Sequence, residues 1–332
     1  MCLLVGGLNP TPDPCAESAQ DAGDDDSGGK CPTARCEAAR RGLGARACKT
    51  PDRGRQTVPR IMNTHAFDAM GTQWCFMSER AADFDAAEQF VRRCEASFSR
   101  FSPYSALSEL NRRRAIQDAQ LTELVEVAMA LHALTNGAFD PTLGDELSAL
   151  GYDRTFAPEL NRGQVSRRSN LLVKTAGDIT ELEGEGSLDL GGIAKGWTVD
   201  AVAMRLRQES GGGVLVDGGG DIRAIDGVWN IGVGDGREVI LKNAGVATSS
   251  TLRRRWEGGT HHIVDPDTGQ SSAQTIDTAT VVASDATLAD ALATAVIVNP
   301  QLLSDPRIPI QQAIVRARDG QWWTTPNWRV EP

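Results

Sequence analysis

The stretch that decides the fold and the function is SLDLGGIAKGWTVD, residues 187–200. Gly191 and Gly192 carry no side chain, so a ligand oxygen can approach the backbone there directly. The residues that follow have a helical pattern, and the free N–H groups and positive dipole end at a helix start attract anions. Lys195 adds a full positive charge. The stretch predicts either a phosphate or pyrophosphate cradle or a glycine-rich helix entry with a surface lysine, and by itself it favours neither.

The composition is typical of a soluble globular protein. The 332 residues carry a formal charge of −10 at pH 7, and 40% of them are hydrophobic. This length supports one large domain or two smaller ones. An acidic chain without a long basic run has no electrostatic basis for binding nucleic acid. No apolar run approaches the roughly 18 to 20 residues that a membrane span needs, so we expect no transmembrane segment.

Residues 1–62 differ from the rest in composition. They hold most of the chain's 7 cysteines and many Gly, Pro, Asp, Arg and Ser residues, but few large apolar ones. Such a segment cannot bury enough surface to offset the entropy of ordering, and the spacing of Cys31 and Cys36 matches no tight zinc pattern. We expect a disordered extension over 1–62, with Met62 as a candidate translation start, followed by one domain over 63–332. The extension shows neither a signal-peptide pattern nor a lipobox, so we expect a cytoplasmic protein.

Hydrophobic periodicity in the remaining chain indicates mixed secondary structure. Apolar residues recur at helical spacing over 84–98, 121–131 and 198–207, and the alanine-rich run 286–298 is also helical. Short β-like runs lie between these helices, and 313–325 reads as a hairpin that turns on Asp319-Gly320. Runs of strands mixed with a few helices, without regular alternation, predict an α+β fold rather than a doubly wound sheet.

The helix expected over 286–298 carries a second chemical signal. Asp290 and Thr294 stand four residues apart and therefore share one helix face, about one turn from each other. A carboxylate and a hydroxyl are hard oxygen ligands that suit Mg²⁺. An acid in an otherwise apolar helix also needs a partner. The alternative interpretation is that Asp290 only caps a neighbouring loop.

Three turn segments complete the candidates. HHIVDPDTG (261–269) places two of the 4 histidines before a turn; such a histidine is more often structural, but an imidazole near a phosphate can exchange a proton at neutral pH. TNGAFDPTLG (135–144) either offers an aromatic face and an acid in one loop or simply ends a helix. We interpret the glycines of LVDGGGDIRA (215–224) as positions of tight backbone packing.

The order of these segments is more specific than any one of them. Eight short blocks follow one another over residues 64–300: AMGT (69–72), FSRFSPYSALSELN (98–111), GAFDPT (137–142), DLGGIAKG (189–196), GGGDI (218–222), ATSS (247–250), HHIVDPDTG (261–269) and ADALATA (289–295). In these blocks the chain resembles the ApbE family of FAD:protein FMN transferases, also called thiamine-biosynthesis lipoproteins. The resemblance implies T-fold-like mixed sheets with packed helices in a single flavin transferase domain over 63–332.

The resemblance also implies a Mg²⁺-dependent reaction. The enzyme would transfer the FMN portion of FAD to a Thr or Ser hydroxyl of an acceptor flavoprotein and release AMP. The expected contacts to FAD are Met70, Phe101, Ala138, Phe139, Asp140, Asp189, Lys195 and Ile263. The expected metal ligands are Asp290, Thr294 and the backbone oxygen of Gly192. His262 and Asp290 are the expected catalytic residues; His262 is the first candidate for the base that takes the hydroxyl proton, and a carboxylate near the metal is the second.

The chain departs from the family pattern at three points. It shows no lipobox, which many members have, and we therefore expect cytoplasmic acceptors. Ser249-Ser250 stands where the family commonly has Ser-Gly. Ala293 stands where some members have a second acid, so one potential metal ligand is missing. The Asp290 and Thr294 pair is intact.

Two other functions remain open from the sequence. An FAD pyrophosphatase would use water in place of the protein hydroxyl and would yield FMN and AMP. It needs the same cradle and metal, so sequence does not separate it from the transferase. A non-catalytic FAD-binding or storage protein would bind the dinucleotide without turnover.

Overall fold

The computed structural model describes residues 62–152, 169–256 and 260–328, so all of the predicted extension except Met62 lies outside the described residues. The described residues belong to one compact unit that mixes helices with largely antiparallel sheets. The predicted α+β class is therefore confirmed.

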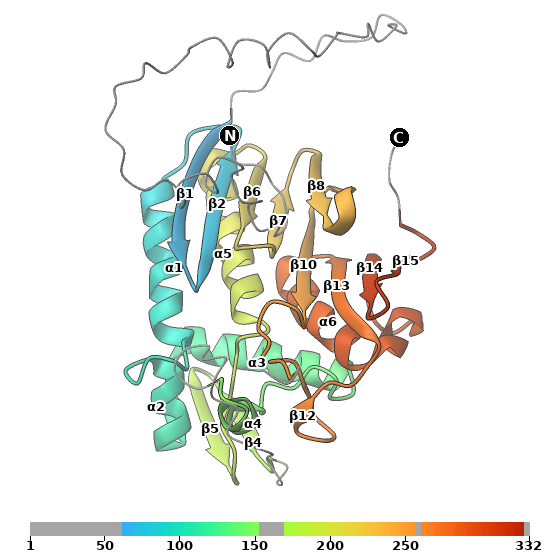
Figure 1. Ribbon diagram of the computed structural model, residues 1–332. Helices are drawn as coiled ribbons and strands as arrows, with labels where there is room; N and C mark the ends of the chain where they lie inside the picture. The colour runs from blue at the N-terminus through green and yellow to red at the C-terminus, as the bar shows by residue number, and fades with distance from the viewer. Residues whose placement is uncertain (1–61, 153–168, 257–259, 329–332) are drawn as a thin grey trace, which may run out of the picture. The chain divides into compact units, whose positions relative to one another are not determined.

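An antiparallel sheet of eight strands forms the framework (Figure 1). In spatial order its strands are β1 (Asn63–Ala69), β2 (Thr72–Ser78), β6 (Val214–Asp217), β7 (Ile222–Ile225), β10 (Ala244–Ser250), β13 (Ile276–Ala283), β14 (Gln312–Ala317) and β15 (Trp322–Thr324). The seam between β7 and β10 is short, because these strands pair over only Ala244–Val246 against Ile222–Ala224. The flanking pair β10–β13 runs from Gly245 to Ser250 and is twice as long.

The remaining elements surround this sheet. The other strands are β3 (Ala115–Gln117), β5 (Ile179–Glu183) and β4 (Leu172–Ala176) in one sheet, the pair β8 (Trp229–Val233) and β9 (Arg237–Leu241), and the pair β11 (Val264–Asp265) and β12 (Gln270–Ser271). The helices are α1 (Phe84–Phe98), α2 (Ala106–Arg113), α3 (Ala119–Leu134), α4 (Gly144–Ala149), α5 (Ala194–Ser210) and α6 (Ala286–Val298), with 3₁₀ turns η2 (Gly234–Gly236) and η3 (Pro300–Ser304). None of the helices in the described ranges has both the length and the apolar character that crossing a membrane requires.

The predicted helix over 198–207 is longer at both ends. Helix α5 begins at Ala194, and its N-cap Ile193 makes no side-chain hydrogen bond. The start was missed because no Ser, Thr, Asp or Asn marks it, and such residues are the usual start signal. The earlier start places Lys195 and Gly196 in the first helical turn.

Strand β10 was not predicted, although it lies between β7 and β13 in the main sheet. Its sequence AGVATSS contains one large aliphatic residue, whereas strands are usually recognised by β-branched and aromatic side chains. Small residues are required there because α6 packs on this strand. A Cβ atom added to Gly245 would overlap the backbone nitrogen of Ala286 at the start of α6.

Helices α5 and α6 also approach each other closely. A Cβ atom at Gly196 of α5 would lie 2.5 Å from the carbonyl oxygen of Ala286 and 2.9 Å from Cβ of Asp290. The carboxylate of Asp200, one turn further along α5, accepts hydrogen bonds from the backbone N–H groups of Ala286 (3.0 Å) and Thr287 (2.8 Å). The amino end of α6 is therefore held by α5 on one side and by β10 on the other.

We predict that Gly196→Ala destabilises the domain. Alanine is the better helix former by about 1 kcal/mol, but its methyl group would press on backbone atoms of α6, and such overpacking costs about 1 to 3 kcal/mol. Urea unfolding should therefore show a lower free energy of unfolding. The control is Gly212→Ala, whose methyl would meet only the side chains of Glu79 and Arg80, at 3.3 Å. A Gly196→Ala protein as stable as the wild type would contradict this packing.

Candidate functional site

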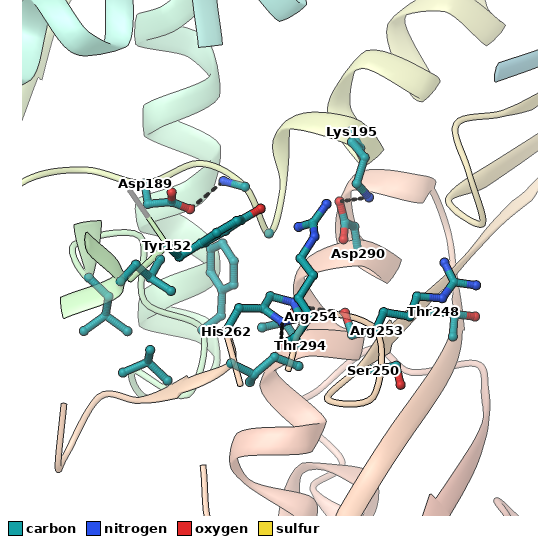
Figure 2. Close-up of a pocket in the computed structure, with 18 of the residues that line it drawn as sticks. Tyr152, Asp189, Lys195, Thr248, Ser250, Arg253, Arg254, His262, Asp290 and Thr294 are labelled. Carbon is teal, nitrogen blue, oxygen red and sulfur yellow. Dashed lines mark hydrogen bonds and ion pairs between the residues drawn. The ribbon is translucent and has the colours of Figure 1, made fainter. Parts of the chain in front are cut away.

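A cavity of about 330 Å³ lies where the glycine-rich turn before α5, helix α6 and three loops meet (Figure 2). Its volume is in the range of small-molecule sites. The predicted site residues that line it are Met70, Ala138, Phe139, Asp140, Asp189, Gly192, Lys195, His262, Ile263, Asp290 and Thr294. The fold thus brings together residues that are more than two hundred positions apart in the sequence.

The glycine-rich turn is fixed by Asp189. One oxygen of its carboxylate accepts a hydrogen bond from the N–H of Gly191 at 2.8 Å. The other forms an ion pair with the guanidinium of Arg100, whose side chain is 8% exposed. Asp189 therefore holds the turn in place, in addition to lining the cavity.

The turn lies directly against α6. A Cβ atom at Gly192 would be 3.2 Å from the ring of Phe139 and 3.7 Å from the hydroxyl oxygen of Thr294. A side chain at this position would therefore fill the space between the turn and the helix. With glycine at this position, residues 192 and 294 line one cavity.

Asp290 is buried and lies beside positively polarised groups. Its side chain is 5% exposed, and one oxygen accepts a hydrogen bond from the N–H of Gly196 at 3.1 Å. The ammonium of Lys195 is 3.9 Å from the same oxygen and forms a closer ion pair with the buried Asp221. The charge of Lys195 is thus shared between two carboxylates, and Asp221 is a partner that the sequence did not suggest.

The oxygen atoms of Asp290, Thr294 and Gly192 fit a hard divalent cation. A carboxylate, a hydroxyl and a backbone carbonyl are all oxygen donors, which Mg²⁺ prefers. In the described part of the chain, no three His, Cys, Asp or Glu side chains are grouped as a metal site. The donor set here is therefore mixed, and Mg²⁺ bound to it would retain water or take substrate oxygens as further ligands.

The imidazole of His262 is held in a defined tautomer. Its Nδ1 is 3.4 Å from the carbonyl oxygen of Arg254. Since a carbonyl can only accept, Nδ1 carries the hydrogen, and Nε2 keeps its lone pair. Burial, reinforced by the guanidinium of Arg254, lowers the pKa of His262 to about 3. The free protein therefore presents a neutral imidazole with an acceptor nitrogen.

Met70 occupies a strained position at the cavity rim. Met70 and Gly71 form the two-residue turn of the β1–β2 hairpin, with φ of 50° and 70°. Positive φ at both positions is typical of a type I′ turn, which favours Asn or Gly, so methionine is unusual there. Its N–H is held by a hydrogen bond to the carboxylate of Glu95 at 2.6 Å. Strain of this kind is common at functional sites.

Phe101 is the predicted contact that does not line the cavity. Its ring packs edge-on against Tyr152, with 5.1 Å between ring centroids. Tyr152 lines the cavity in its place, and burial raises the pKa of the Tyr152 hydroxyl, which therefore stays protonated at neutral pH. No sequence pattern pointed to Tyr152, although it is one of only 2 tyrosines in the chain.

Two arginines of the cavity were also missed. Arg253 and Arg254 both line it, and the guanidinium of Arg254 lies over the ring of Tyr152 at 5.4 Å. Figure 2 shows the Arg254 side chain between Tyr152 and Asp290. Neither arginine pairs with a carboxylate among the residues that the structure describes. The available signal was the run Arg253–Arg255 in an acidic chain, two residues after the ATSS block.

Comparisons with known proteins identify the family of the chain. A family model described as the ApbE family matches residues 70–302. The FAD:protein FMN transferase of Treponema pallidum is 32% identical over an alignment of 235 residues, and the match covers 58% of this chain and 65% of the relative. The FAD:protein FMN transferase of Vibrio cholerae is 32% identical over an alignment of 260 residues, and the match covers 69% of this chain and 75% of the relative. The chain thus spans slightly less than two thirds of the first relative.

Solved structures show the same fold. The ApbE protein of Thermotoga maritima is 25% identical, with a TM-score of 0.70 over 80% of this chain and 97% of that one. The flavinyl transferase ApbE of Pseudomonas stutzeri, in its apo form, is 22% identical, with a TM-score of 0.67 over 82% of this chain and 98% of that one. Sequence blocks, family model and fold lead to one conclusion: this chain belongs to the ApbE family.

Proposed function

We propose that residues 63–332 form a catalytic domain that transfers the FMN portion of FAD to a Thr or Ser hydroxyl of an acceptor flavoprotein and releases AMP, with Mg²⁺ bound. One observation carries the proposal: the glycine-rich turn before α5 and the Asp290 and Thr294 oxygens of α6 line the same cavity. The names of the relatives, FAD:protein FMN transferase, support it.

In this proposal the substrate diphosphate lies between the turn and α6. Lys195 and Arg254 would contact its oxygens, and Phe139 and Ile263 offer apolar surface to the rings. Asp290, Thr294 and the Gly192 carbonyl would hold Mg²⁺, which when bound neutralises phosphate charge and stabilises the charge that develops on the leaving group. Most of the catalysis then comes from positioning and electrostatic stabilisation.

The transfer exchanges one bond to phosphorus for another. The acceptor hydroxyl oxygen attacks the phosphorus of the FMN phosphate, and the bridging P–O bond to the AMP phosphate breaks. The electron pair of that bond leaves with AMP. The hydroxyl proton moves to Nε2 of His262, which is the acceptor nitrogen that the hydrogen bond of Nδ1 leaves available.

The low pKa of His262 in the free protein would make its basicity depend on bound FAD. Two positive groups, Arg254 and Lys195, contribute to it alongside burial. A bound diphosphate would offset both charges and so raise the affinity of the imidazole for a proton. The base would then strengthen only when FAD is present.

We predict that Asp290→Asn abolishes most of the transfer. The variant keeps the size of the side chain and an acceptor for Gly196, but it loses the charge that would hold the metal, and we expect kcat/KM to fall by about a hundredfold. The assay incubates the protein with FAD, Mg²⁺ and acceptor, and reads flavin fluorescence on the denatured acceptor. Asp145→Asn, an exposed position outside the cavity, should keep full activity.

The same incubation separates the alternatives. Free FMN and AMP that accumulate equally without acceptor would indicate a pyrophosphatase. Tight FAD binding without AMP would indicate a storage protein. Full transfer by Asp290→Asn would contradict the proposed metal site.

We predict that His262 titrates outside the neutral range in the free protein. Its imidazole NMR signal, identified by its loss in His262→Asn, should show no midpoint between pH 5 and 8, because burial and Arg254 bring the pKa to about 3. Addition of FAD without metal should move the midpoint upward. A midpoint near the ordinary value of about 6.5 in the free protein would contradict the electrostatics of the site.

We predict that Arg254→Ala impairs the use of FAD. Losing a charged hydrogen-bond donor to phosphate costs about 1.5 to 3 kcal/mol, which is roughly a ten- to hundredfold loss in kcat/KM. Arg254→Lys should recover part of it. Arg255→Ala is the control, because Arg255 is exposed and does not line the cavity. Equal effects at both positions would show that Arg254 has no specific role.

A further inference from the structure

A second cavity adjoins the first and has the opposite character. It has a volume of about 420 Å³ and shares Ala138, Asp140 and Leu143 with the first cavity. The shared residues belong to the loop before α4, and Pro266 and Asp267 of the loop between β11 and β12 line only the second cavity. Nothing in the proposed transfer step uses it.

Its charged groups are nearly all acidic. Asp140, Glu146, Asp265 and Asp267 line this acidic cavity, and the described residues of its wall include neither Lys nor Arg. Among the described lining residues only His132 can become positive, and its Nδ1 is 3.6 Å from a carboxylate oxygen of Asp140. Amide side chains of Asn136 and Gln274 lie on the same wall. Such a surface attracts a positive group.

Glu146 gives the independent sign of a missing partner. It is 2% exposed, and one carboxylate oxygen accepts the N–H of Ser169 at 3.2 Å, but the other is buried without a hydrogen-bond partner. Burial raises the pKa of Glu146, and Asp145 and Asp140 add to the effect. A buried carboxylate oxygen without a hydrogen-bond donor is costly. A positively charged donor in the cavity would supply the missing hydrogen bond and would also stabilise the charged form of Glu146.

The wall favours an extended cation over a metal ion. No three acidic, histidine or cysteine side chains are close enough together to hold a metal in the described part of the chain. An ammonium has three hydrogens to donate and a guanidinium five, and both can reach carboxylates that are spread apart.

The position of the cavity suggests the source of the cation. Because it shares a wall with the cavity where FAD would react, a polypeptide that places a hydroxyl in the first can place a side chain in the second. Each residue of extended chain spans about 3.3 to 3.6 Å, so the two side chains would be a few residues apart. We propose that the acidic cavity binds the ammonium or guanidinium group of a basic residue close in sequence to the acceptor Thr or Ser. This inference rests on the proposed transferase function.

The test uses short peptides with one threonine in an alanine and glycine background. A lysine, or its uncharged analogue norleucine, is moved one position at a time along both sides of the threonine. We expect lysine at one or two positions to raise kcat/KM for transfer at least about tenfold over norleucine. The ratio of kcat/KM for the lysine peptide to kcat/KM for the norleucine peptide should fall toward one in Glu146→Gln, because this variant lacks the carboxylate charge. Asp265→Asn, a more exposed position of the same wall, should lower it in part.

Asp145→Asn is the matched control. It removes the same charge from the neighbouring residue of α4, but Asp145 does not line the cavity and bonds to Ser187 instead. The lysine preference should survive in this variant. A wild-type protein that uses lysine and norleucine peptides equally, or a preference that survives in Glu146→Gln, would overturn the proposal.

Peptide binding without FAD separates this inference from the transferase function. Fluorescence anisotropy of labelled peptides should show the same lysine preference. If lysine peptides bind more tightly but no FMN is transferred, the transferase function is contradicted and the cation site is supported. If FMN is transferred equally to lysine and norleucine peptides, the transferase function is supported and the cation site is contradicted.

Discussion

The contact between Gly196 and the amino end of α6 is the constraint on which the site depends. It lets two helices meet backbone to backbone, so that the N–H of Gly196 reaches the carboxylate of Asp290. Asp200 repeats the connection one turn later by holding the first N–H groups of α6. Any larger residue at Gly196 would separate α5 from α6 and with them the glycine-rich turn from the oxygens of Asp290 and Thr294. Packing and chemistry are therefore set by the same residue.

The charged residues of the cavity differ in whether an oppositely charged side chain already neutralises them. Asp189 forms an ion pair with Arg100, so it mainly holds the glycine-rich turn in place, whereas the charge of Lys195 is shared between Asp221 and Asp290. Arg254 is steadied by the face of Tyr152, and no carboxylate of the described chain neutralises it. A stacked guanidinium keeps its full charge and its donors for an incoming anion. The described charged residues of the adjoining cavity, apart from His132, are acidic, so the two neighbouring walls differ in charge.

Much of the fold followed from local sequence patterns, whereas most residues of the candidate site were expected from the family resemblance. The apolar spacing of 84–98 and 286–298 predicted α1 and α6 to the residue, since both have strong capping aspartates, Asp83 and Asp285. The start of α5 and strand β10 were missed where small residues serve close packing and leave no apolar signal. Tyr152 and Arg254 were missed because their roles come from long-range neighbours. Phe101 was expected from the resemblance as a contact to FAD; its ring packs edge-on against Tyr152, and it is not among the residues that line the cavity.

The short seam between β7 and β10 sets a mechanical requirement. Three residue pairs join the part of the sheet that carries α5 to the part that carries α6, and so short a ladder resists sliding poorly. Oxygen ligands of a small cation tolerate errors of only a few tenths of an ångström. The packing of α5 against α6 at Gly196 and Asp200 must therefore supply the rigidity that the short strand pairing lacks. Sequence changes in the outer strands are then tolerated as long as this helix contact is intact.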